Sequence, residues 1–210
     1  MTVIDQYETY RKIGTQLNSD ILEAYSDRDL IVETARELGI EFDGLNLAYE
    51  FESQMAIHFE YALYEYRRDE TTAAERYLEE GRCENDAERE ILEATVDAEP
   101  SLFEIESVGE SGPQLTVIDL LSDRDEHTLL DVNLSKTAES GVVLFCRPVR
   151  YGELTTTSGV SLPFPGEEKD HLLAEHDRRI SSDEQRALSR QRFVAFHDLY
   201  RDHGIHIQYR

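Results

Sequence analysis

The sequence predicts an α+β fold in which an N-terminal helical bundle, a small antiparallel β-sheet or partly open barrel, and a C-terminal helical arm follow one another. The main observation is that the spacing of apolar residues changes from the helical period of 3.6 to the strand period of 2 at Pro100. The helical period returns at about Glu167, and no parallel strand–helix–strand alternation occurs. We therefore expect a helical region over 1–98, a β unit over 99–166 and a helical arm over 167–210, around one core.

Five helices are expected before Pro100, because each shows a start signal, an apolar stripe or both. The longest covers about Asn46–Arg68, where His58 and six apolar or aromatic side chains share one arc. A histidine in that position is expected to be a neutral, hydrogen-bonded core residue. The other helices are expected at the stripe Tyr10–Ile21, between the Ser26 cap and Gly39, between the Thr72 cap and Gly81, and from the Asn85 cap to Pro100.

Five short strands are expected between Ser101 and Pro165, with turn-forming residues between most of them. Alternation of apolar and polar residues around Leu130 and Val132 indicates that one face of the sheet is buried. The expected strands are Leu102–Val108, Leu115–Leu121, Thr128–Leu134, Val142–Tyr151 and Thr155–Leu162.

The C-terminal arm is expected to contain two helices. The first covers about Glu167–Ile180, and the second begins at a Ser181 or Ser182 cap and ends at about His203. The alternating tail Ile205–Tyr209 is expected to add an edge strand.

Acidic residues outnumber basic ones by 45 to 21, which leaves a formal net charge of −24 and an isoelectric point near 4.5. Only Lys12, Lys136 and Lys169 are lysines. Self-repulsion on such a surface is screened at molar salt, where the Debye length is about 3 Å. The composition therefore predicts a soluble protein of a salt-in halophile and excludes a generally basic nucleic-acid binder.

The chain carries no export or membrane signal that we can identify. Its longest apolar run, about Val142–Cys146, is far shorter than the ~20 residues of a bilayer span. Met1–Asp5 lacks the basic and apolar regions of a secretory signal. We therefore expect a cytoplasmic protein that does not bind membranes, with Cys83 and Cys146 as free thiols.

Several stretches of the middle of the chain share a recognisable order of residue types: His58–Tyr66, Thr72–Leu78, Glu88–Arg89, Ser101–Ile105, Val117–Leu121 and Ser140–Arg147. Over about residues 55–165 they resemble the body of poorly characterised proteins that often end in a SEC-C zinc-chelating motif. That motif needs a cysteine-rich C-terminus, and residues 147–210 contain no cysteine. The resemblance therefore implies no zinc role here, and it implies no activity.

The last helix contains the strongest candidate binding surface. Residues 171–210 hold seven arginines and six acidic residues, a net charge of +1 in a chain of −24. Four basic or titratable side chains fall within an arc of about 60°, and two aromatic residues lie beside it. These residues are Arg186, Arg190, His197 and Arg201, with Phe193 and Tyr200.

Three roles are open for these residues: internal pairing with the acidic body, a contact with a protein partner or a second copy, or phosphate and base contacts with nucleic acid. We expect a non-catalytic binding protein, and a protein partner or homodimer more than nucleic acid. The alternative is an enzyme, because Arg192 and His197 resemble the R-x4-H pattern of HEPN-type ribonucleases. The two side chains point about 140° apart on a helix, so a second chain or helix would have to complete that site.

Other titratable residues predict no catalytic or metal site. His171 and His176 are five residues apart, and His203 and His206 flank Gly204, so neither pair has good metal-ligand spacing on a helix. We expect no metal and no cofactor. A further group of acidic residues is expected to form a solvated face: Glu52, Glu60, Glu65, Asp69 and Glu70.

Overall fold

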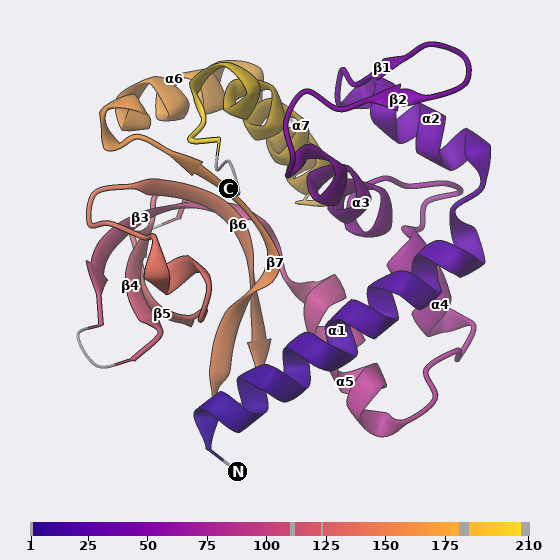
Figure 1. Cartoon of the computed structure of the whole chain (residues 1–210), viewed down its shortest axis with the longest axis horizontal. Coiled ribbons are helices and arrows are strands. Elements are labelled where there is room, and N and C mark those ends of the chain that lie inside the picture. The colour runs from indigo at the N-terminus through magenta and orange to yellow at the C-terminus, as the bar shows by residue number, and fades with distance from the viewer. Residues whose placement is uncertain (1, 110–111, 123, 181–184, 207–210) are drawn as a thin grey trace.

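An open five-stranded antiparallel sheet lies against helices from both ends of the chain (Figure 1). The structure is a computed structural model that describes residues 2–109, 112–122, 124–180 and 185–206, and only the backbone of 185 and 186. In Figure 1 the N-terminal helices fill one side of the molecule and the sheet fills the other, with the C-terminal helices along the top. The predicted α+β class and the order of helices, sheet and helices are confirmed.

Within residues 2–100 the predicted helices form, and local caps explain where several of them begin. The Thr72 hydroxyl accepts the Glu75 N–H at 3.1 Å, and the Glu75 carboxylate accepts the Thr72 N–H at 2.7 Å. The second helix is capped by Asp27 rather than by Ser26. The elements are α1 (Val3–Tyr25), α2 (Arg28–Glu37), β1 (Glu41–Phe42), β2 (Leu47–Ala48), α3 (Gln54–Tyr64), α4 (Ala73–Glu79) and α5 (Asp86–Asp97).

The long helix expected over Asn46–Arg68 is wrong in its length, because α3 covers only the middle of that range. A hairpin of β1 and β2 precedes it. The Asp43 carboxylate accepts the N–H groups of Leu45 and Asn46, both at 2.7 Å, and Gly44 has φ of 96°. Asp and Gly favour this tight turn, and it pairs Leu47 and Ala48 with β1, so these two residues form a strand and not the start of the expected helix.

The sheet has the strand order β5-β4-β3-β6-β7, and every pair is antiparallel. The edge strands β5 and β7 contact each other, so the sheet curls without closing. The five strands are β3 (Ser101–Val108), β4 (Gln114–Asp119), β5 (Glu126–Leu130), β6 (Val143–Tyr151) and β7 (Leu154–Phe164).

The C-terminal arm follows β7 through a 3-10 turn, η2 (Gly166–Glu168), into α6 (Lys169–Arg179) and α7 (Gln185–His203). Ser181 and Ser182, the predicted caps of the last helix, lie outside the described residues. The Ile205 N–H donates to the Pro163 carbonyl at 2.8 Å, next to β7. Residues 207–209 of the predicted edge strand also lie outside the described residues.

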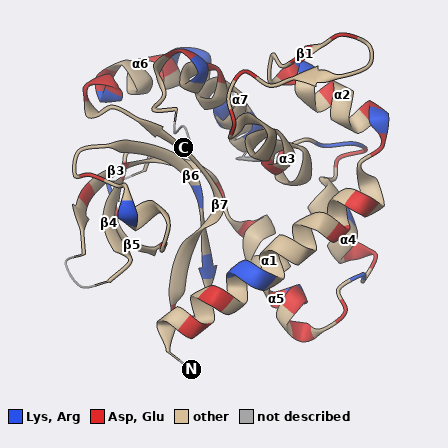
Figure 2. Cartoon of the chain, viewed as in Figure 1, with Lys and Arg blue, Asp and Glu red and all other residues tan. Residues whose placement is uncertain are grey.

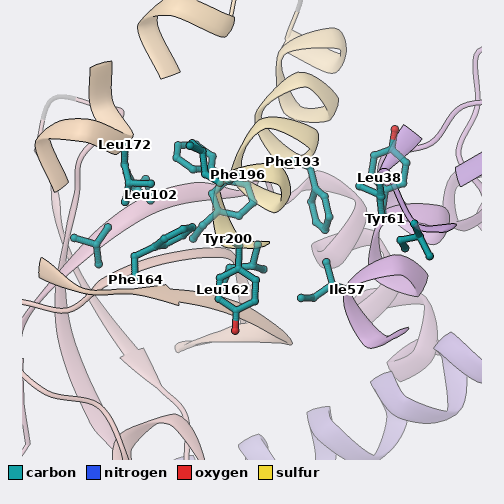
Figure 3. Packing of buried hydrophobic residues seen from close by; sticks show 14 of the residues in the cluster. Leu38, Ile57, Tyr61, Leu102, Leu162, Phe164, Leu172, Phe193, Phe196 and Tyr200 are labelled. Atoms are coloured by element: carbon teal, nitrogen blue, oxygen red, sulfur yellow. The ribbon is translucent and has the colours of Figure 1, made fainter. Parts of the chain in front are cut away.

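The largest hydrophobic cluster draws on all three parts of the chain (Figure 3). Phe196 of α7 is fully buried, and its ring stacks on Phe145 of β6 with centroids 4.6 Å apart. Ile57 and Tyr61 of α3 face α7 from the other side, as Figure 3 shows. α7 is therefore held between the sheet and α3.

The other general expectations can be compared directly with the fold. His58 is fully buried, with Thr34 Oγ1 2.7 Å from Nε2 and the Tyr49 hydroxyl 3.0 Å from Nδ1, as predicted. Cys83 and Cys146 are free thiols, also as predicted. None of the helices in the described part of the chain has the length and apolar character that crossing a membrane requires.

Candidate functional site

The aromatic part of the predicted binding stripe is buried. Phe193 and Tyr200 are 3% and 2% exposed, and His197 is fully buried. α7 is covered by the sheet on one side and by α3 on the other, so its buried arc is wider than a single amphipathic stripe. The prediction that Phe193, His197 and Tyr200 face a partner is wrong for this reason.

The arginines of the stripe pair with carboxylates of the same chain. Arg190 forms an ion pair with Glu37 of α2, and its Nε lies 3.2 Å from the Tyr61 hydroxyl. Arg201 Nε donates to Glu50 at 2.8 Å, and this hydrogen bond lowers the pKa of the Glu50 carboxyl. Of the three roles that the sequence leaves open, these contacts are those of internal pairing. The side chain of Arg186 lies outside the described residues.

Arg192 and His197 do not share a cleft. Arg192 Nε lies 3.4 Å from His176 Nε2 of α6, whereas His197 Nε2 lies 3.4 Å from Gln54 Nε2 of α3. Burial, together with the charge of Arg201, lowers the pKa of His197 to about 4. In this arrangement the His197 ring is neutral and closed off from solvent, a poor position for exchanging protons with a bound substrate.

A groove of about 750 Å³ opens between α2 and α7, and arginines from four parts of the chain line it. Its floor is apolar, formed by Leu38 beyond α2 and by Val194 and Ala195 of α7. The lining arginines are Arg36 of α2, Arg67 of the loop after α3, Arg179 of α6, and Arg190 and Arg201 of α7.

Local structure holds several of these guanidinium groups in place. Arg67 makes a two-pronged contact with Glu75, at 2.6 and 2.8 Å, and donates to the Glu70 carbonyl at 2.7 Å. Glu70 has φ of 69°, and its neighbour Asp69 has φ of 51°, conformations that cost non-glycine residues roughly 1 kcal/mol each. The rim of the groove is therefore a strained turn that presents Arg67.

Gly39 packs against the Arg201 guanidinium. Its φ of 66° favours glycine, and a Cβ there would lie 3.0 Å from Arg201 Nη1. The guanidinium thus lies directly against the backbone at the end of α2, where it also reaches Glu50. The turn after α2 and the end of α7 are therefore in direct contact through Gly39 and Arg201.

The groove is cationic although the chain is strongly acidic. Its lining contains five arginines and the three acids Glu37, Glu70 and Asp198, a formal charge of +2. Figure 2 shows how widely acidic residues spread over α1, α4 and α5 elsewhere. Arg36 is exposed, and it forms no ion pair or side-chain hydrogen bond with any residue that the structure describes.

Sequence reasoning found Arg190 and Arg201 and missed the other three lining arginines. The net charge of +1 over residues 171–210 is the signal that pointed to the region. Arg36 and Arg67 lie on segments far away in the sequence, and nothing in their local patterns connects them to α7.

Two of the acids expected on a solvated face are buried, which corrects that expectation. The side chains of Glu60 and Glu65 are each 3% exposed, and both pair with Arg147 of β6, itself 4% exposed. Burial raises the pKa of the Glu65 carboxyl, and the Arg147 charge opposes that rise. Glu65 also accepts the Ser189 hydroxyl at 2.7 Å, which ties α3 to α7.

Comparison with known proteins places the chain in a family. A search of curated proteins and a search of solved structures each return no match. A family model matches residues 1–210, and its description is a family of unknown function, DUF7986. The resemblance to SEC-C-motif proteins over residues 55–165 has no counterpart among these findings. Because the match spans the whole chain, the protein belongs to the DUF7986 family.

Proposed function

We propose that this protein is a binding protein and that the groove between α2 and α7 takes a phosphorylated small molecule. The observation that carries the proposal is the lining itself: five guanidinium groups converge on one concavity in a chain of net charge −24. With its three acids the lining still has a formal charge of +2, which an anionic ligand balances.

The size and the floor of the groove favour a small organic molecule over an inorganic ion. Sites for such ligands typically enclose about 300–1,000 Å³, and this groove is about 750 Å³. Leu38, Val194 and Ala195 offer apolar surface to the body of a ligand. A ligand of this site should therefore combine a charged group with an apolar or planar part.

Phosphate is the favoured charged group because four of the arginines already have carboxylate neighbours. Arg67, Arg179, Arg190 and Arg201 each form an ion pair with the protein. A phosphate ester carries about −1.5 to −2 charges and three acceptor oxygens, so it can add to such guanidinium groups where a single carboxylate gains little. Arg36 pairs with none of the side chains that the structure describes, so among these its donors are available for this ligand.

We propose binding rather than a reaction because of what lines the groove. The described lining residues include no Ser, Cys, His or Lys, the side chains that most often serve as nucleophiles. The role proposed for the groove is therefore to recognise and hold an anionic ligand through its guanidinium groups.

Charge reversal at Arg36 tests the proposal. Pyrophosphate and ATP are titrated into the full chain by calorimetry at one fixed KCl concentration. Arg36→Glu removes an exposed cation that is paired with no residue the structure describes. It should weaken ATP binding about tenfold or more, the loss of one charge-assisted hydrogen bond. The matched control is Arg89→Glu, the same charge reversal on α5, where Arg89 lies 3.6 Å from Glu93. This variant should bind ATP as tightly as the wild type does.

Two results would count against a small phosphorylated ligand. One is no heat of binding for either probe with the wild type at millimolar concentrations. The other is a concentration-dependent dimer that Arg36→Glu disrupts while ATP leaves it unchanged, which would favour the protein interface.

We also propose that the acidic surface is an adaptation to a salt-rich cytoplasm. The excess of carboxylates is spread over several helices and is not gathered at one site, which supports a role in hydration. The salt dependence of stability, given below, tests this.

A further inference from the structure

The junction between the start of α6 and the end of α7 brings together three metal-ligating side chains. Glu168 is the last residue of η2 and the N-cap of α6, His171 lies three residues later in the first turn of α6, and His203 is the last residue of α7. One ligand atom from each lies within 4.8 Å of the ligand atoms of the other two. His203 Nδ1 and Glu168 Oε2 are 3.3 Å apart, and the rings of His171 and His203 have centroids 4.9 Å apart.

We infer that Glu168, His171 and His203 form a site for a divalent transition metal, with Zn²⁺ as the ion that the donor set favours. Two imidazoles and one carboxylate are a donor set of zinc sites that leave the fourth position to water. A Glu three residues before a His also supplies metal ligands in helical bundles, and here the Glu is the residue that caps the helix. The proposal is independent of the arginine-lined groove.

The three ligand atoms must move slightly closer together to coordinate one Zn²⁺ ion. Ligand atoms around tetrahedral Zn²⁺ lie about 3.3–3.5 Å apart, because each bond is about 2.0–2.2 Å long. The Glu168–His203 pair already has that separation. His171 is exposed, so rotation of its side chain can bring the third ligand atom in without a backbone shift.

The backbone on both sides of the cluster is anchored independently of any metal. Lys169 Nζ contacts the Glu104 carboxylate of β3 at 3.0 and 3.1 Å, which holds the start of α6 to the sheet. After α7, a Cβ on Gly204 would lie 2.1 Å from the Tyr200 ring, so only glycine fits there. A metal ion at this point would bridge two elements that are already in position, and binding would cost little reorganisation.

Titration of the metal-free full chain tests the site. After removal of metal by chelation, Zn²⁺ is added in a calorimeter, and Co²⁺ is added as a spectroscopic probe of tetrahedral coordination. The wild type should bind one ion and develop the intense visible bands of tetrahedral Co²⁺. His171→Ala and His203→Ala should each weaken binding about tenfold or more and abolish those bands.

Matched controls separate the site from the acidic surface. Glu168→Gln should weaken binding, whereas Glu167→Gln, the same change one residue earlier, and His127→Ala on β5 should leave it unchanged. Because His171 is exposed, His171→Ala keeps the fold even if His203→Ala unfolds the end of α7. Absence of one-to-one binding by the wild type, full binding by His171→Ala, or equal effects of Glu167→Gln and Glu168→Gln would overturn the inference.

Discussion

Arg147 of β6 and Glu65 beyond α3 form an ion pair that is almost completely removed from water. Their side chains are 4% and 3% exposed, and Glu60 adds a second carboxylate at 3.1 Å from Arg147 Nε. The Arg147 guanidinium also donates to the Ala98 carbonyl at the end of α5. One cation thus joins the sheet to two helical segments, and Glu65 extends the network to Ser189 of α7.

Arg147→Met should destabilise the protein by about 3–5 kcal/mol, because it leaves Glu60 and Glu65 buried without a cation. Urea unfolding followed by circular dichroism measures the change. The triple variant Arg147→Met, Glu60→Gln, Glu65→Gln removes the unpaired charges and should recover much of the loss. A triple variant as unstable as Arg147→Met would show that packing, and not charge, makes Arg147 important.

Stability should fall on acidification between about pH 6.5 and pH 4. Burial lowers the pKa of both His58 and His197 from 6.5 to about 4, and the charge of Arg201 contributes at His197. The unfolded chain therefore binds more protons in this window, and the stability that these neutral rings contribute above pH 6.5 is lost as the pH falls. The slope is about 1.4 kcal/mol per pH unit for each histidine.

The double variant His58→Gln, His197→Gln isolates this contribution from that of the carboxylates. Its free energy of unfolding should change less between pH 6.5 and pH 4.5 than that of the wild type, by up to about 2.7 kcal/mol per pH unit. Parallel profiles of the two proteins would mean that neither ring becomes protonated on unfolding.

The melting temperature should rise with KCl into the molar range. With a net charge of −24, self-repulsion opposes the compact state, and raising the salt from about 0.1 M to 1 M shortens the Debye length from about 10 Å to about 3 Å. Calorimetric melts at about 0.1 M and about 2 M KCl measure the effect. An equal or lower melting temperature at the higher concentration contradicts the halophile proposal.

Arg201→Glu should destabilise the protein by about 1 kcal/mol, because it replaces a partly exposed ion pair with two facing carboxylates. The exchange variant Glu50→Arg, Arg201→Glu restores opposite charges and should recover part of that loss. Chemical unfolding of the four proteins in a double-mutant cycle gives the coupling energy. A coupling energy of zero would mean that the contact does not contribute to stability.

Much of the secondary structure could be predicted from the sequence because its signals are local. Thr72 and Glu75 cap a helix through contacts within four residues. The period-2 alternation around Leu115 and Val117 predicts the strand β4 without any knowledge of its neighbours in the sheet. The start of α3 was predicted incorrectly because Leu47 and Ala48 pair with Phe42 and Glu41 across the Asp43–Gly44 turn, and apolar spacing along the chain does not reveal that pairing.

The sequence by itself determined the fold class, the burial of His58 and the excess of acidic side chains, since each follows from composition or from neighbours along the chain. Only the tertiary structure decided which charges are buried and which meet. Glu65 and Arg147 are 82 positions apart, and no local pattern distinguishes a glutamate that will face water from one that will face a guanidinium. The same holds for the arginines of the groove and for His171 and His203, because folding, and not spacing, sets the distance between residues on different elements.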